Sequence, residues 1–104
     1  MDEAPFHKLC SDSTITTKQI NNHLNEHGYN VALEIDTIHG MNPLQMLSIN
    51  PHAPAVSIAA LLNANVEAAF RLDNGGNMSL DYAREYNVDG LVEMINGLCN
   101  HRHS

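Results

Sequence analysis

The stretch at residues 40–47, Gly-Met-Asn-Pro-Leu-Gln-Met-Leu, decides the fold because the chain contains it three times in variant form. An earlier variant, Ala-Pro-Phe-His-Lys-Leu-Cys, stands at residues 4–10, and a later one, Gly-Asn-Met-Ser-Leu-Asp-Tyr-Ala, at residues 76–83. Aligned on Pro5, Pro43 and Ser79, the copies lie 38 and 36 residues apart. Self-similarity at such a period is typical of repeat architectures.

Each copy has the same local pattern. A polar turn is followed by Pro or Ser, a large apolar residue and a short helical run. Proline at the first helical position loses no hydrogen bond, because that N–H has no partner within the helix. The spacing predicts six helices, two per copy, at residues 5–10, 16 or 17–27, 43–48, 55–63 or 64, 79–86 and 88 or 89–98.

These strings resemble the Gly-x-Thr-Pro-Leu-His-x-Ala signature of ankyrin repeats. The match departs from the signature at Asn42 and Met78, which replace Thr, and at Ser79, which replaces Pro. Only the first copy keeps the signature His, as His7. The resemblance implies an all-α, ankyrin-like solenoid of stacked helix pairs with connecting turns. It also implies that the chain binds a protein partner and is not an enzyme.

The resemblance extends over almost the whole chain, so we expect one ankyrin-like domain at residues 1–104. Its repeats span approximately residues 4–36, 37–73 and 74–100, and a polar tail follows at 101–104. Two segments precede the later turns. Alanine, Glu and Arg favour a helical turn at residues 66–72, whereas residues 29–35 fit either a helical turn or a strand-like link. Asn65 is expected to end the preceding helix in a left-handed conformation.

Composition excludes several classes of protein. The 104 residues carry a formal net charge of -7, which argues against nucleic acid as a partner, since that affinity comes mainly from cationic contacts to phosphate. No run of 18 apolar residues predicts a membrane span, and the acidic start is unlike a signal peptide. Cys10 and Cys99 fall in the first and last copies, too far apart to bridge. We therefore expect a reduced, intracellular and cytoplasmic protein.

The chain shows no recognisable catalytic, cofactor or metal constellation. His23 and His27 share a helix face, but zinc needs three or four ligands and no His-Glu-x-x-His motif is present. We interpret both as solvated histidines of a polar face. His7 is expected to make a structural hydrogen bond across the helix–turn junction, and Cys10 to be buried. No cofactor is predicted.

The ankyrin resemblance also assigns the partner-binding residues, because ligands of that family usually meet turn tips and the ends of the first helices. The turn tips are Ile38, His39, Met41, Asn74 and Asn77; the helix ends are Ser11, Asp12, Ile49, Asn50, Glu85 and Tyr86. Four of these, taken as exposed, are the anchor candidates because apolar and aromatic side chains dominate interface energy: Ile38, Met41, Ile49 and Tyr86. The alternative is that Ile38 and Met41 pack on the neighbouring turn.

A second reading makes the chain a structural segment, a C-terminal cap or spacer of a larger repeat protein with no ligand of its own. In its favour are the polar tail and a polar face of the sixth helix, which terminal caps need for solubility.

The first repeat lacks a preceding turn. We therefore expect self-association through this uncapped first repeat, and we expect neither nucleic-acid nor membrane binding.

Overall fold

The computed structural model describes residues 5–103, and their regular secondary structure is entirely helical. Within these described residues, six α-helices and two short 3-10 helices follow one another in the order α1 (Pro5–Cys10), α2 (Thr17–His27), η1 (Tyr29–Leu33), α3 (Pro43–Ile49), α4 (Ala55–Ala64), η2 (Val66–Phe70), α5 (Ser79–Tyr86) and α6 (Val88–His103). The prediction of an all-α fold is confirmed.

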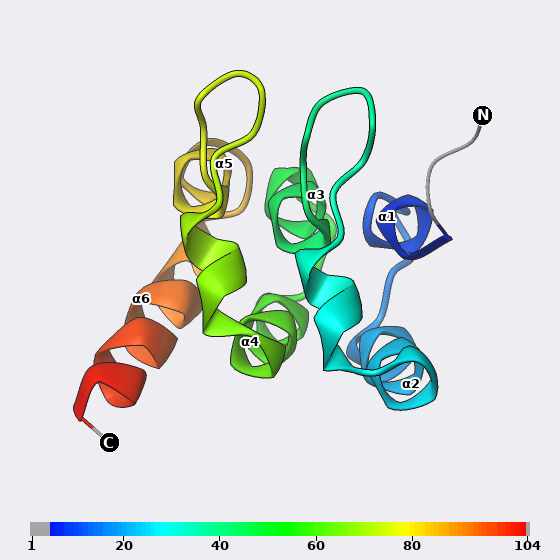
Figure 1. Ribbon diagram of the computed structural model, residues 1–104. Coiled ribbons are helices and arrows are strands. Elements are labelled where there is room, and N and C mark those ends of the chain that lie inside the picture. Colours follow the sequence, from blue (N-terminus) through cyan, green and yellow to red (C-terminus); the bar gives the residue numbers. More distant parts are fainter. Residues whose placement is uncertain (1–4, 104) are drawn as a thin grey trace.

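The helices form two rows (Figure 1). Helices α1, α3 and α5 lie side by side in one row, and α2, α4 and α6 in the other. The two loops that precede α3 and α5 project beyond the first row. Each copy of the sequence pattern is therefore one helix pair, and successive pairs pack against each other.

The predicted helix starts are correct, and two of them, those of α2 and α3, coincide with reciprocal side-chain caps. Asn42 precedes Pro43 and accepts the backbone N–H of Gln45 at 2.9 Å, while the Gln45 side chain accepts the N–H of Asn42 at 2.8 Å. Thr16 and Gln19 make the same reciprocal pair before α2. Such a capping box satisfies N–H groups that a helix cannot pair internally.

One continuous core joins the copies. Its largest fully buried apolar side chains come from five of the six α-helices: Phe6, Ile20, Leu44, Leu47, Ile58, Leu61, Leu62 and Met94. Burial of each such side chain contributes roughly 1.5–3 kcal/mol. Leu80 and Leu91 are partly buried and pack on the edge of this core.

A forward link joins each copy to the next. The Nε2 atom of His7 donates to the carbonyl oxygen of Met41 at 2.8 Å, and Nε2 of Gln45 donates to the equivalent carbonyl of Asn77 at 2.7 Å. The third copy has Asp81 at this position, and its carboxylate accepts the N–H at the start of its own helix. The expected structural bond of His7 is therefore present, and it connects two copies.

A backward link runs along the other ends of the first-row helices. The side-chain amide of Asn50 donates to the carbonyls of Cys10 at 3.1 Å and Asp12 at 2.8 Å. The amide of Asn87 donates to the carbonyls of Asn50 at 2.9 Å and Ala53 at 3.0 Å. Because these amides are buried, the two links fix the spacing between successive copies.

Three details of the structure either decide between alternatives that the sequence left open or differ from the prediction. The segment after α2 is a helical turn, η1, and the predicted turn after α4 is present as η2. Asn65 has a φ of -160°, so the prediction of a left-handed cap is wrong; its side chain instead accepts the N–H of Glu67. Helix α6 continues to His103, so residues 101–103 of the predicted tail are helical.

Candidate protein-binding surface

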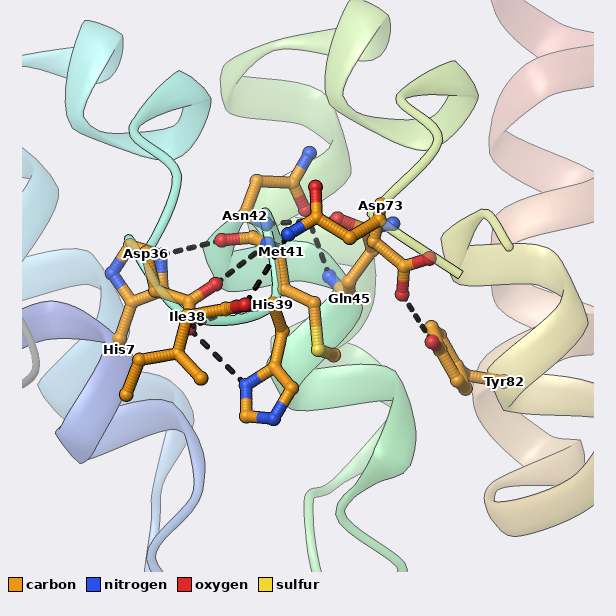
Figure 2. Close-up of polar contacts among 10 residues, drawn as sticks. His7, Asp36, Ile38, His39, Met41, Asn42, Gln45, Asp73 and Tyr82 are labelled. Atoms are coloured by element: carbon orange, nitrogen blue, oxygen red, sulfur yellow. Dashed lines mark hydrogen bonds and ion pairs between the residues drawn. The ribbon is translucent and has the colours of Figure 1, made fainter. Parts of the chain in front are cut away.

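The turn before α3 is organised by one buried carboxylate, that of Asp36. Its Oδ1 accepts the N–H of Met41 at 2.7 Å, and its Oδ2 accepts the N–H of His39 at 3.1 Å (Figure 2). Burial raises the pKa of the Asp36 carboxyl, but these hydrogen bonds outweigh it and hold the pKa below its ordinary value. The turn is therefore built around an ionised aspartate.

The turn before α5 repeats this design with Asp73. Its Oδ1 accepts the N–H groups of Gly75 at 2.9 Å and Asn77 at 3.0 Å. Its Oδ2 accepts the hydroxyl of Tyr82, which lies on α5 (Figure 2). This third bond ties the turn to the helix that follows it.

The two turns are bonded to each other. The backbone N–H of Asn74 donates to the carbonyl of His39 at 2.8 Å, and its side-chain amide donates to that of Ile38 at 3.2 Å. Ile38 stays 66% exposed, so the interpretation that this residue packs on the neighbouring turn is wrong. The structure thus brings three predicted residues, Ile38, His39 and Asn74, onto one hydrogen-bonded rim.

The remaining predicted residues are distributed over other parts of the stack. Ser11, Asp12, Glu85 and Tyr86 are exposed at the far ends of α1 and α5. Asn77 is partly buried, and so is Ile49, which was expected to be an exposed anchor. Helix α3 has seven residues and so spans about 10 Å at 1.5 Å per residue. The helix ends therefore form a surface separate from the turn rim.

Two predicted contact residues are buried. Met41 was expected to be an exposed anchor, but it is 5% exposed because its N–H is drawn inward by Asp36 and its carbonyl by His7. Asn50 is 6% exposed because its amide makes the backward link. Both predictions of an exposed contact are wrong; these residues hold the copies together.

Sequence reasoning missed a set of exposed apolar side chains beside the turns. We define the apolar ledge as Leu33, Ile35, Phe70 and Leu72, all of which are exposed. Leu33 and Phe70 end the two 3-10 helices, which lie side by side, cyan and yellow-green in Figure 1. The members pair at a spacing of 37 residues. This periodicity is the sequence signal from which the apolar ledge could have been predicted.

A shallow groove runs between the two halves of the ledge. It is lined by Leu33 and Phe70, with the polar side chains of Asn42, Glu67 and Arg71 around them. A predominantly apolar centre with a polar rim is the usual anatomy of a protein-binding patch. The ledge and the turn rim are therefore the candidate protein-binding surface.

The histidines and cysteines show a different pattern. The ring of His23 stacks on Phe6 at a centroid distance of 4.2 Å and contacts the ring of His27 at 4.3 Å. Burial, followed by the charge of His27, lowers the pKa of His23. Cys10 is buried, as predicted, and burial raises the pKa of its thiol far above the ordinary value. These contacts are packing interactions.

Within the part of the chain that the structure describes, no three His, Cys, Asp or Glu side chains group together in a way that would hold a metal ion. Across residues 5–103, none of the helices combines the length and the apolar character that crossing a membrane requires.

The chain matches no protein-family model, and neither curated proteins nor solved structures show significant similarity to it.

Proposed function

We propose that this chain is a non-catalytic, ankyrin-like recognition module that binds a protein partner through the apolar ledge and the adjoining turn rim. One observation carries the proposal. Equivalent apolar positions in two successive copies, Leu33 with Phe70 and Ile35 with Leu72, are exposed together, and the first pair lines one groove. Side chains that a fold does not need for its own core, repeated at the same positions, indicate a surface that contacts something else.

The ankyrin-like part of the proposal is supported by the forward link. His7 stands at the signature histidine of the family, and Gln45 stands at the same position of the next copy. Each side chain donates to a carbonyl of the next copy, that of the residue directly after the turn glycine. The equivalence of these two bonds supports a repeat array in which glutamine substitutes for histidine.

Charge indicates the chemistry of the partner. The chain carries a formal net charge of -7, and Arg71 is the single cationic side chain among the groove residues. A partner segment with apolar side chains for the ledge and Lys or Arg at its margins is complementary to this surface. Electrostatic complementarity of this kind speeds association and selects partners more than it adds affinity.

Affinity capture with matched variants tests the proposal. The immobilised wild-type chain is compared with Phe70→Asp, which places a charge on the ledge, and with Val56→Asp as the control. Val56 is 59% exposed on α4, away from the groove. We expect one protein to be retained by the wild type and by Val56→Asp and lost by Phe70→Asp, with all three equally helical by circular dichroism. Equal retention by Phe70→Asp would refute the ledge as the binding surface.

The helix ends provide a further control. Because they lie about 10 Å from the turns along α3, Tyr86→Ala should retain the partner, whereas Ile38→Asp on the rim should weaken it. The reverse ranking would move the interface to the helix ends.

A further inference from the structure

Helix α6 carries a bare apolar stripe on its outer side. Val88, Val92 and Ile95 are 59%, 50% and 48% exposed, and Cys99 is exposed as well. These four residues are spaced by four, three and four positions, which is the spacing of the apolar seam in a coiled coil. We call them the α6 seam. By contrast, every exposed side chain of α2, at the other end of the same row, is polar.

The opposite side of α6 is already occupied. A side chain at Gly97 would stand 3.0 Å from Leu62 of α4, and one at Gly90 would overlap Ile58. The two glycines therefore permit close approach of α4 to α6. At about 100° per residue they lie on the face of the helix opposite the seam. Helix α6 has two faces suited to helix packing, and α4 covers one of them.

The residues of α4 that are equivalent to the α6 seam show what these positions contact in the preceding copy. Val92 and Ile95 correspond to Ala59 and Leu62 of α4, since Leu91 aligns with Ile58. Ala59 and Leu62 line an open groove between α4 and α6, whose other wall is formed by residues of α6. The seam is therefore the continuation of an established helix–helix interface, and its natural occupant is another helix.

Position 81 does not supply the forward link that joins the first three copies. The forward link requires a side-chain donor, which His7 and Gln45 supply. Asp81 holds the same position in the third copy, and its carboxylate accepts hydrogen bonds only. The third copy thus has the apolar seam without the polar link, which suits a partner that contacts α6 alone.

We propose that α6 pairs with α6 of a second copy of this chain, antiparallel, across a two-fold axis midway between Val92 and Ile95. This register places Val92 against Ile95 of the partner subunit and Val88 against Cys99 of the partner subunit. Asp89 then faces the neutral Asn96 of the partner subunit, so no like charges oppose each other beside the seam. Antiparallel helices also bring opposite ends of their dipoles together.

The register has a consequence for Cys99. In this arrangement the Cys99 residues of the two subunits are separated by eleven residues along the paired helices. This is about 16 Å at 1.5 Å per residue, which no disulfide spans. A parallel pair would place them in one layer, within bridging distance. Cys10 is buried and does not compete. Oxidative cross-linking therefore distinguishes the two orientations.

The first experiment measures mass against concentration by sedimentation equilibrium. The seam is short compared with a standard interface, so we expect a weak dimer with a dissociation constant on the order of 0.1 mM. Val92→Asp buries a charge in the seam and should raise this constant at least about tenfold. Val56→Asp, an exposed valine changed in the same way on α4, should dimerise like the wild type. A wild type that stays at 11.5 kDa at about 1 mM, or an equal constant for Val92→Asp, would overturn the proposal.

The second experiment tests the register. Val88→Cys should form an intermolecular disulfide dimer on mild oxidation, and Val88→Cys with Cys99→Ser should not. The wild type should remain uncross-linked. Cross-linking of the wild type through Cys99 would indicate a parallel pair, and species larger than a dimer would indicate head-to-tail stacking. Either result contradicts the antiparallel pair.

Discussion

The hydroxyl of Tyr82 donates a hydrogen bond to the carboxylate of Asp73, joining α5 to the turn that precedes it. Asp73 also accepts two backbone N–H groups of its own turn. One side chain thus organises the turn and fastens it to the helix. Because Asn74 of this turn bonds to the turn before α3, the rim of the proposed binding surface depends on the pair.

Tyr82→Phe removes the hydroxyl and leaves the ring in place. A hydrogen bond to a charged group contributes roughly 1.5–3 kcal/mol when well buried. Tyr82 is partly exposed, so we expect a loss of about 1–2 kcal/mol in the free energy of unfolding. Urea denaturation at neutral pH measures it. Tyr86→Phe, at an exposed tyrosine of the same helix, should change stability by less than about 0.5 kcal/mol. Equal effects at the two positions would show that the pair contributes nothing.

Acid should weaken both turns. Burial raises the pKa of the Asp73 carboxyl, but hydrogen bonds from Tyr82 and the turn N–H groups lower it more, so the net shift is downward; Asp36 shifts the same way. A carboxyl group whose pKa is lower in the folded than in the unfolded protein stabilises the folded state above about pH 4. This contribution is lost as the pH falls through the folded-state pKa. The stability gap between wild type and Tyr82→Phe should therefore narrow between pH 7 and pH 3. A constant gap would contradict an ionised Asp73.

Gly40 is required by the contact between the two turns. Its φ is +69°, and an added Cβ would stand 2.6 Å from the side-chain oxygen of Asn74. Gly40→Ala should therefore lower the free energy of unfolding by about 1–3 kcal/mol. Gly75→Ala is the matched control, since its Cβ would make ordinary contacts at 3.4 Å. Thermal unfolding compares the two, and a Gly75→Ala variant as unstable as Gly40→Ala would exclude this explanation.

Asn50 tests the backward link between copies. Asn50→Asp keeps the shape of the side chain but removes the amide that bonds the carbonyls of Cys10 and Asp12. It leaves buried acceptors unpaired and adds a buried charge, so a loss of about 2–4 kcal/mol is expected. The same change at exposed Asn22 should be close to neutral. If chemical denaturation gives similar values for both, the link does not stabilise the stack.

Much of the fold was readable from the sequence because it rests on local chemistry. The starts of α1, α3 and α5 fall at Pro5, Pro43 and Ser79, the residues on which the three copies align. The lengths of the loops between paired helices also agree, to within one residue, with the predicted helix bounds. Six residues separate α1 from α2, five separate α3 from α4, and Asn87 alone separates α5 from α6.

The candidate surface was readable only in part because exposure depends on distant contacts. Ile38 was correctly expected at a turn tip, but Met41 lies inside because of bonds to Asp36 and His7. Leu33 and Phe70 look like core residues by type, and only the packing of η1 on η2 reveals them as surface.

Helix α6 shows the same limit. Its apolar residues divide into two groups. Leu91, Met94 and Leu98 face the core, whereas Val92 and Ile95 do not. Both groups have helical spacing, and sequence alone does not say which one the neighbouring helix covers.

The most direct test of the central claim, that the apolar ledge binds a protein partner, is site-specific photocross-linking. A benzophenone-bearing amino acid is placed singly at Phe70, Leu33 or Val56, and the cross-linked protein is identified by mass spectrometry. The account predicts the same partner from Phe70 and Leu33, which line one groove, and no such product from Val56 on α4. Cross-linking of that partner from Val56 alone, or equally from all three positions, would contradict it.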